Sequence, residues 1–469
     1  MKKTLLTLLS CLIISILVFS GCTQPLKYDP SITSSMAVTG DALKYSEYIY
    51  FANAFKPYTD LQKGDNNVGN VKNEALYRVK LVNGEIETDE ETLLPKNVEL
   101  VISKIAGSEC SFMYSIGKYI YFASPNAHQD IDAATKFELT TYFRVQTDGT
   151  GLSEIYTTKN QISKQTVLKI DNKFYLIFQD GKSIIKIELG DGIRHSATAL
   201  VSDILDAVFA EKYTSENDRF IYYTTELSEE NKNLGRSGNR LYKVDIVSGV
   251  SSQITSVFDR TIIPIAVIDG SFYFKMDESD TKNYYYSYES GSFSTRTKIS
   301  QPIDLFEIKQ FLAMRADSNN KTYYIYAVST DNIKKTYCLQ KGNIDFSSEN
   351  LLIEGEVKIL FTHGDYVYYC SEGENENKGI FRISIIDKEI QTIYDKENFK
   401  SANISFDGKY IYFYAQTESN TTGIYYMHRA PIRNAEIGLP CSAELLGVLD
   451  DEDIPKDEES DETEQNQGE

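Results

Sequence analysis

A short aromatic motif recurs along most of the chain and constrains the fold more than any other sequence feature. The motif is an aromatic residue, then Ile or Val, then Tyr, then a second aromatic residue, as at Tyr48–Phe51, Tyr119–Phe122 and Tyr410–Phe413. Looser copies begin at residues 174, 220, 272, 324 and 366, so successive copies start 71, 55, 46, 52, 52, 42 and 44 residues apart. Such near-regular spacing indicates a repeat architecture.

Each copy of the motif belongs to a unit of four strand-like runs. One run precedes it, as at Ile262–Ile268, and another follows it, as at Tyr142–Val145. A turn such as Asp148–Gly149 comes next, and a shorter run such as Leu152–Tyr156 closes the unit. β-Branched and aromatic runs bounded by Gly, Asn and Asp are typical of an antiparallel sheet. Each unit is therefore predicted to form one four-stranded sheet.

Eight such units predict an all-β fold, an eight-bladed β-propeller in which radial packing buries both faces of every blade. Seven blades are the alternative, because the sixth unit is irregular before Thr322 and the first lacks a clear opening strand. A long β-sandwich or two β domains fit less well, since no Pro/Ser-rich linker interrupts the repeat. We expect the ring to close between residues 28–37 and the last unit near residues 443–449.

The N-terminus has the pattern of an export signal. Met1-Lys2-Lys3 is followed by an uncharged, mostly apolar run from Thr4 to Phe19, which is short for a membrane-spanning helix. Phe19-Ser20-Gly21-Cys22 resembles a bacterial lipobox. That resemblance implies cleavage between Gly21 and Cys22 and lipidation of Cys22. A plain signal peptide with a chance Cys is the alternative.

Two stretches resemble known propeller repeats. Phe406–Phe413, with Asp407-Gly408-Lys409 at its turn, resembles the strand turn of TolB-like propellers. Tyr142–Gly151 resembles a turn of the propellers related to low-density lipoprotein receptors. The chain also looks like bacterial lipoproteins of unknown function that carry such repeats. The resemblance covers residues 35–449, and it implies a fold but no catalytic residues.

The composition and motifs of the chain limit the kinds of binding and catalysis that we expect of it. A formal net charge of -20 disfavours nucleic-acid binding, and four His residues, all in different units, do not predict a metal centre. No HExxH, Walker-type or GxSxG motif occurs, so we assign no catalytic residue, metal or cofactor. Asp130-Ile131-Asp132 lacks the rest of a calcium loop and is read as a solvated turn. Most of the 34 Tyr residues fall in the repeat strands, where they are expected to pack between blades.

The remaining cysteines do not form a recognisable motif. Cys110, Cys338, Cys370 and Cys441 have no CxxC spacing. An exported disulfide is compatible with them, but the sequence does not assign a pairing.

Loop length is the most informative functional signal. Between the second and third runs of a unit, the connections span residues 52–75, 123–141 and 224–240 in units one, two and four, against only 179–183 in unit three. Such connections emerge on one face of a propeller. They are expected either to form a partner-binding surface or to be tolerated insertions.

The sequence thus predicts a signal peptide (1–21), a lipidated Cys with a short tether (22–34), a propeller (35–449) and a disordered acidic tail (450–469). The tail carries eleven acidic residues and one Lys. We expect an exported protein, held by its lipid at the outer face of the bacterial cell membrane, or at the outer membrane where one exists. We expect it to bind a protein, peptide or glycan. An envelope polysaccharide hydrolase or lyase, with its site at the axial mouth of the propeller, is the alternative.

Overall fold

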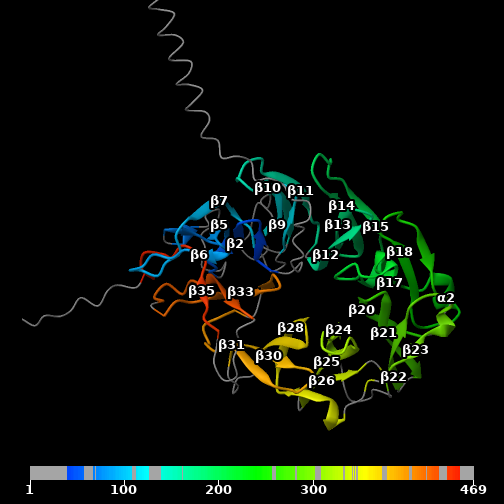
Figure 1. Cartoon of the computed structure of the whole chain (residues 1–469). Coiled ribbons are helices and arrows are strands. Elements are labelled where there is room, and N and C mark those ends of the chain that lie inside the picture. Colours follow the sequence, from blue (N-terminus) through cyan, green and yellow to red (C-terminus); the bar gives the residue numbers. More distant parts are fainter. Residues whose placement is uncertain are drawn as a thin grey trace, which may run out of the picture. The chain divides into compact units, whose positions relative to one another are not determined.

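The computed structural model describes residues 40–56, 67–68, 70–107, 112–125, 139–160, 162–255, 260–279, 282–300, 308–330, 333–340, 342, 344, 347–371, 378–400, 404–418, 420–432 and 441–454. Within these residues, eight antiparallel sheets follow one another in chain order and form an eight-bladed β-propeller (Figure 1). The prediction of eight blades is confirmed. The predicted signal peptide, Cys22 and the segment 28–37 lie outside the described residues.

Each blade has four main strands that follow one another in chain order, and in the first blade short extra strands lie between them. The first strands are β1 (Ala42–Tyr45), β8 (Met113–Ile116), β12 (Ile162–Ile170), β16 (Ile204–Val208), β20 (Ile262–Ile268), β24 (Ile308–Arg315), β28 (Val357–His363) and β32 (Ser405–Phe406). The second strands are β2 (Tyr48–Asn53), β9 (Tyr119–Pro125), β13 (Lys173–Asp180), β17 (Phe220–Thr225), β21 (Ser271–Ser279), β25 (Thr322–Thr330), β29 (Tyr366–Ser371) and β33 (Tyr410–Ala415). Every copy of the aromatic motif therefore lies in a second strand.

The third and fourth strands form the outer half of each blade. The third strands are β5 (Ala75–Val82), β10 (Thr140–Gln146), β14 (Ser183–Leu189), β18 (Arg240–Asp245), β22 (Lys282–Tyr288), β26 (Ile333–Gln340), β30 (Ile380–Ser384) and β34 (Tyr426–Pro431). The fourth strands are β7 (Val98–Ile105), β11 (Ser153–Thr157), β15 (Ala197–Val201), β19 (Ser251–Gln253), β23 (Thr297–Lys298), β27 (Leu351–Glu354), β31 (Ile390–Tyr394) and β35 (Glu444–Leu445).

A few short elements lie in the connections. The hairpin β3 (Asn67–Val68) with β4 (Val71–Lys72) lies between β2 and β5, and β6 (Glu85–Ile86) pairs with the end of β5. The described residues contain one α-helix, α2 (Glu229–Asn233), and the 3-10 turns η2 (Glu216–Arg219), η3 (Phe293–Thr295) and η4 (Ser348–Asn350). No described helix is long and apolar enough to cross a membrane.

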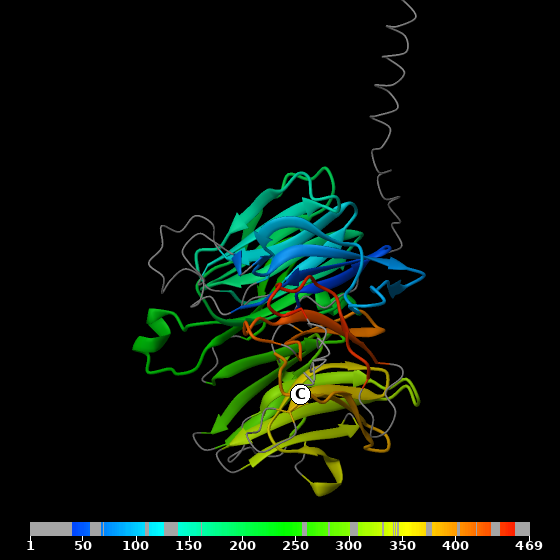
Figure 2. The same ribbon diagram turned by 90° about the vertical axis from the view of Figure 1, so that its left-hand side faces the viewer.

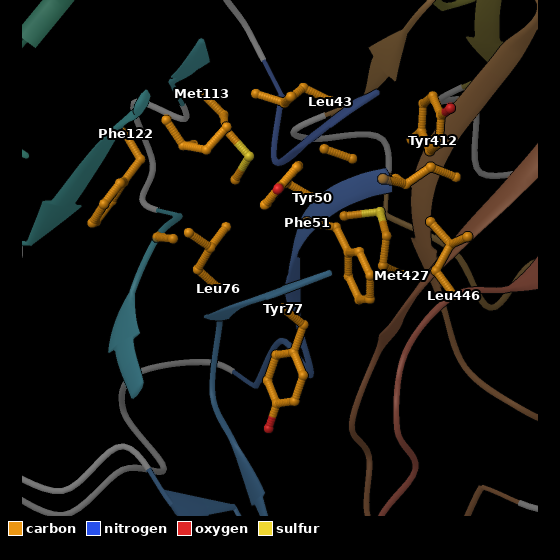
Figure 3. Packing of buried hydrophobic residues seen from close by; sticks show 14 of the residues in the cluster. Leu43, Tyr50, Phe51, Leu76, Tyr77, Met113, Phe122, Tyr412, Met427 and Leu446 are labelled. Atoms are coloured by element: carbon orange, nitrogen blue, oxygen red, sulfur yellow. The ribbon is translucent and has the colours of Figure 1, made fainter. Parts of the chain in front are cut away.

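Burial on both faces explains why the second strands are almost continuously apolar. All of β33 and all but the first residue of β2 are buried, because each blade packs against a neighbour on either side. Around β2, side chains from the first, second and eighth blades form one cluster (Figure 3). Tyr50, Tyr121, Tyr222 and Tyr412 are fully buried at the third position of their motifs, which confirms that these rings pack between blades.

A basic side chain in the third strand links several blades to the next one. It donates to a backbone carbonyl just beyond the third strand of the following blade: Arg78 to Thr147 at 2.6 Å, Arg144 to Gly190 at 3.4 Å and Lys186 to Ile246 at 2.8 Å. In five blades this cation also lies over the first ring of the aromatic motif, in the pairs Arg78–Tyr48, Arg144–Tyr119, Lys243–Phe220, Arg382–Tyr366 and Arg429–Tyr410. The repeat therefore encodes blade-to-blade contacts as well as strands.

Among the described residues, no blade combines strands from both ends of the chain. All four strands of the eighth blade come from residues 405–445, and β1 supplies the opening strand that the first unit seemed to lack. The two complete blades meet through packing and hydrogen bonds, which include Ala42 N to Ser405 Oγ (3.2 Å), Tyr414 Oη to Ala52 O (3.1 Å) and Asn53 Nδ2 to Val448 O (2.9 Å). Glu444 and Leu445 pair with β34 of the same blade, and Val448 accepts the hydrogen bond from Asn53 of the first blade. The expected partner segment 28–37 lies outside the described residues.

The first residues of the segment predicted as a tail are folded. Asp450 and Asp453 are buried and hydrogen-bonded, so residues 450–454 belong to the folded body. The first residues of the acidic segment therefore pack against the eighth blade. Residues 455–469 lie outside the described residues.

Candidate functional site

The face on which the second strands end carries the long connections and is the candidate site. In an antiparallel blade, the connection from the second to the third strand and the connection to the next blade leave from the same end. We call this the loop face. The first-to-second and third-to-fourth turns lie on the opposite face. In Figure 2 the green connection with α2 projects well beyond its strands.

The connection of the fourth blade is fastened to the fifth. The Asn239 side chain pairs with the backbone of Ile262, with Nδ2 donating to the carbonyl at 2.8 Å and Oδ1 accepting from the amide at 2.9 Å. The Asn239 side chain thus forms the two hydrogen bonds with Ile262 that a residue of a neighbouring strand would form. Gly238 precedes it at φ 95°, and a Cβ there would collide with the backbone of Arg260. Only Gly fits this approach.

The same connection is also organised internally. Ser228 precedes α2, and its Oγ accepts from Asn231 at 2.8 Å and from Arg240 at 3.2 Å. Leu227 is buried, whereas Leu234 at the end of the helix is 68% exposed. The connection therefore holds an exposed apolar side chain on an ordered support.

The connection of the first blade is fastened to the eighth. Phe55 forms a backbone bridge with Tyr425, with N–O distances of 2.7 and 2.9 Å in the two directions. Asn70, at the tip of the β3–β4 hairpin, donates its amide to Asp450 at 2.8 Å and its Nδ2 to Asp451 at 2.7 Å. Two long connections are thus tied to the neighbouring blade by Asn residues.

A buried polar cluster lies beneath the loop face at the junction of the eighth and first blades. Asp41 and Glu74 are fully buried, and Oδ2 of Asp41 and Oε1 of Glu74 lie 3.0 and 2.9 Å from the position that a Cβ on Gly107 would take. Tyr414 Oη donates to Asp41 at 3.1 Å. Gly107 therefore leaves room for two neighbouring carboxylates.

Lys400 completes this cluster. Its ammonium lies 3.0 Å from the centre of the Phe55 ring. Burial lowers the pKa of Lys400, while the charges of Glu74 and Asp41 raise it in part. The charges of the two carboxylates thus offset part of the free-energy cost of burying the Lys400 cation.

Other residues singled out in the sequence have structural roles or lie elsewhere. Asp148 Oδ1 accepts from the Thr150 amide at 2.9 Å and Gly149 has φ 87°; Asp407 Oδ1 accepts from the Tyr410 amide at 2.7 Å and Gly408 has φ 89°. Both pairs are turn chemistry, as predicted. Asp130, Asp132, His128, Cys110 and the connection of the second blade from residue 126 to 138 lie outside the described residues.

Histidines and cysteines do not gather in the part of the chain that is described. His195, His363 and His428 lie in three different blades, and no group of three or more His, Cys, Asp or Glu side chains there could hold a metal ion. Cys338 is half-buried, whereas Cys370 and Cys441 are buried.

The sequence did not single out the residues that fasten the long connections. Asn70 and Asn239 each stand directly after a Gly and shortly before a third strand. A repeated Gly-Asn pair at this point of two units is the signal that could have identified them. Asp453 was assigned to the tail because it lies in an acidic run.

Solved structures resemble this chain distantly. TolB from Acinetobacter baumannii aligns at 12% identity and a TM-score of 0.32, over 53% of this chain and 58% of that one. A prolyl endopeptidase aligns at 10% identity and a TM-score of 0.46, over 85% and 55% of the two chains. A puromycin hydrolase aligns at 10% identity and a TM-score of 0.44, over 68% and 51%.

The chain spans little more than half the length of these proteins, and likeness of this degree carries no argument about activity. No protein-family model and no curated protein sequence matches the chain.

Proposed function

We propose that this protein is a lipid-anchored β-propeller of the bacterial cell envelope, which binds a protein, peptide or glycan partner on its loop face. The observation that carries the proposal is the fastening of the long connections of the first and fourth blades. Both are tied to a neighbouring blade by the side chain of an Asn residue, Asn70 and Asn239. Binding surfaces are commonly loops that a rigid scaffold holds in place.

Tolerated insertions would not need such fastening. Lengthening a flexible surface loop costs little free energy, so an insertion without a role can remain loosely attached. The fourth-blade connection instead orders Ser228, Asn231 and Asn239 by hydrogen bonds. It also leaves Leu234 exposed on this support. An ordered loop that presents an apolar side chain is favourable for binding, because less entropy is lost when the partner docks.

A loop exchange tests the proposal. Thr225 pairs with Arg240 across the fourth-blade connection, as Asp180 pairs with Ser183 across the tight turn of the third blade. Replacing residues 226–239 by the Gly-Lys of that turn keeps the strand register. We expect the exchanged protein to fold but to recover less partner than wild type when used to capture proteins and glycans from native envelopes.

Two matched point variants accompany the exchange. Leu234→Asn lies on the loop face, and Leu93→Asn changes an equally exposed Leu in a third-to-fourth connection, on the opposite face. We expect capture to weaken with Leu234→Asn and to be unchanged with Leu93→Asn. A folded loop exchange that captures the same partner in equal amounts would argue against this function for the fourth-blade loop.

The anchor has its own test. Cys22→Ala removes the thiol that lipidation requires. We expect wild type in the membrane fraction and the variant in the soluble exported fraction. Two acyl chains hold a protein at a bilayer stably, since each buried CH₂ contributes roughly 0.8 kcal/mol. Equal membrane fractions of the two proteins would overturn the anchor.

An envelope polysaccharide hydrolase or lyase is the second candidate. The observation in its favour is the carboxylate pair Asp41–Glu74, since glycoside hydrolysis uses two carboxyl groups. Both side chains are fully buried, and Asp41 accepts a hydrogen bond from Tyr414 across the blade junction. Ring closure accounts for this pair better than catalysis. Turnover of an envelope polysaccharide that is lost in Asp41→Asn, with the fold kept, would reverse this preference.

A further inference from the structure

Three arginines gather where the fourth-blade connection is fastened to the fifth blade. Arg236 and Arg240 lie on either side of Asn239 in the connection, and Arg260 lies opposite them, just before β20. The backbone brings the two segments together, because the Asn239 amide donates to the Arg260 carbonyl at 3.1 Å and Gly238 touches the Arg260 backbone. We call Arg236, Arg240 and Arg260 the arginine surface.

The charge of the arginine surface is not neutralised by a described carboxylate. Arg236 is exposed, and Arg240 and Arg260 are half-buried. Arg240 donates to a neutral hydroxyl, Ser228 Oγ, at 3.2 Å. The ion pairs that described residues of the fourth and fifth blades form are Lys164–Asp206, Arg219–Glu216, Arg219–Asp245, Lys232–Glu226 and Lys232–Glu229. None of these pairs includes an arginine of the surface.

The acidic residues of the same connection lie at its other end. Glu226 and Glu229 both contact Lys232, at 2.8 and 3.0 Å, and Glu230 lies in the first turn of α2. The hydrogen bond and charge of Lys232, with the charge of Lys182 from the third blade, lower the pKa of Glu226. Carboxylates and arginines are thus separated along residues 226–240, and lysines face the carboxylates.

Leu234 gives the arginine surface an apolar neighbour on a fixed support. Its side chain is 68% exposed. The amides of Leu234 and Arg236 both donate to the carbonyl of the buried Asn231, at 3.2 Å each. The backbone therefore holds an apolar side chain and a guanidinium two residues apart. A partner that meets an ordered surface of this kind loses less entropy on docking.

The side chains of this surface suit a peptide better than a sugar. Stacking on a sugar ring uses aromatic side chains, and residues 226–240 contain none. Guanidinium groups bind carboxylates through paired N–H···O bonds, and arginine is enriched at protein interfaces. Positive charge on one partner selects negative charge on the other. An aliphatic side chain beside arginines is therefore complementary to an apolar residue flanked by carboxylates.

We propose that the partner presents an acidic peptide segment to the arginine surface. An apolar side chain of that segment packs on Leu234, its carboxylates bind Arg236 and Arg260, and Arg240 adds charge. The inference rests on the proposed function, because it names the chemistry of the partner that docks on the fourth-blade connection. An acidic glycan is the other occupant that carries carboxylates, and the test includes one.

Calorimetric titration of the purified full chain tests the proposal. The probes are the peptide acetyl-Glu-Leu-Glu-Leu-Glu-amide, the same peptide with Gln in place of each Glu, and trigalacturonic acid. We expect the acidic peptide to bind, and the Gln peptide and the trisaccharide to bind at least about tenfold more weakly. Absence of binding by the acidic peptide overturns the proposal. Equal or tighter binding of trigalacturonic acid overturns the assignment to a peptide.

Two pairs of substitutions locate the binding. Arg236→Gln with Arg260→Gln should weaken binding of the acidic peptide about tenfold or more. The matched control, Arg194→Gln with Arg315→Gln, removes two exposed arginines of the opposite face and should leave the affinity within about twofold. Equal losses in the two pairs would mean that net charge attracts the peptide, and would overturn the arginine surface.

Partner capture separates this inference from the proposed function. The paired substitution of Arg236 and Arg260 is compared with the exchange of residues 226–239 in capture from native envelopes. If the exchange loses the partner and the paired variant retains it fully, the acidic-peptide inference fails and the partner surface stands. If the exchanged protein captures as much as wild type, the proposed function fails, whatever the peptide does.

Discussion

The guanidinium of Arg429 in the eighth blade donates to the carboxylate of Glu85 in the first blade, 3.3 Å away, and so joins the two ends of the ring. Arg429 is almost fully buried, and its Nε also donates to Glu444 at 2.7 Å. Its guanidinium lies over the Tyr410 ring. Arg429 is the third-strand cation of the eighth blade. The contact that closes the ring is therefore a variant of the contact that links its successive blades.

Arg429 is buried whereas Glu85 is mostly exposed, so substitutions of the two residues should lower stability by different amounts. Arg429→Ala should lower the free energy of unfolding by about 2–4 kcal/mol, because buried packing is lost as well as charge. Glu85→Ala should cost less than about 1 kcal/mol, since Glu85 is mostly exposed and water can replace it. Urea unfolding measures both. Equal losses would show that the ion pair, and not the packing of Arg429, holds the junction.

Two tyrosines at the same motif position allow a matched test of inter-blade hydrogen bonds. Tyr50 Oη donates to Thr147 O at 3.1 Å in the next blade, whereas the buried Tyr222 Oη has no partner among the described residues. Burial raises the pKa of Tyr50 to about 12, so the phenol stays a donor at neutral pH. Tyr50→Phe should cost about 0.5–1.5 kcal/mol, and Tyr222→Phe should be neutral or slightly stabilising.

Thermal unfolding of the two Phe variants measures this difference. The comparison controls for the loss of a hydroxyl as such, because both rings are fully buried in second strands. A Tyr222→Phe variant as unstable as Tyr50→Phe would show that the hydroxyls do not act through inter-blade bonds.

The sequence predicts those parts of the structure that repeat in every blade, and it does not predict contacts that occur only once. The aromatic motif and the runs around it lie in every blade, so spacing alone places the strands of a blade, for example the first strand β20 at Ile262–Ile268. The fastening of Asn239 to Ile262 occurs once, and so does the burial of Asp453. A unique contact between segments far apart in the chain leaves no repeat to detect.

The same reason explains the polar cluster at the junction of the eighth and first blades. Asp41 and Lys400 stand 359 residues apart in the sequence, and nothing there distinguishes them from other charged residues near a strand. Only the closure of the ring brings them together with Glu74. The blade motif could be predicted, whereas the chemistry between two blades could not.

His428 should make stability depend on pH. Burial lowers its pKa to about 4, although the hydrogen bond with Tyr426 O opposes the shift. The folded pKa is thus below the unfolded value near 6.5, so the unfolded chain takes up the proton first as the pH falls. This contribution is fully present above pH 6.5 and is lost between about pH 6.5 and pH 4.

His428→Asn keeps a donor near Tyr426 O and removes the titration. We expect the loss of unfolding free energy between pH 7 and pH 4.5 to be about 2 kcal/mol smaller in this variant than in wild type, whatever its stability at pH 7. Denaturant unfolding at both pH values measures the difference. Parallel pH profiles of the two proteins would contradict the role assigned to His428.

Removing residues 450–454 from the chain should lower the stability of the protein. Asp453 accepts from the Thr421 amide at 2.9 Å and from Tyr426 Oη at 2.8 Å, and so holds the second-to-third connection of the eighth blade. Burial alone would raise the pKa of Asp453, yet hydrogen bonds from Thr422, Thr421 and Tyr426 lower it overall. The carboxylate therefore stays charged at neutral pH, and its stabilising effect is lost only as the pH falls below about 4.

A protein ending at Leu449 should therefore unfold at a lower urea concentration than one ending at Ile454, by about 2–4 kcal/mol, because several buried donors lose their acceptor together. Asp453→Ala in the full chain should reproduce most of that loss, and Asp451→Ala, an exposed neighbour, should reproduce little of it. If the two shortened proteins were equally stable, residues 450–454 would belong functionally to the acidic tail, despite the burial of Asp453.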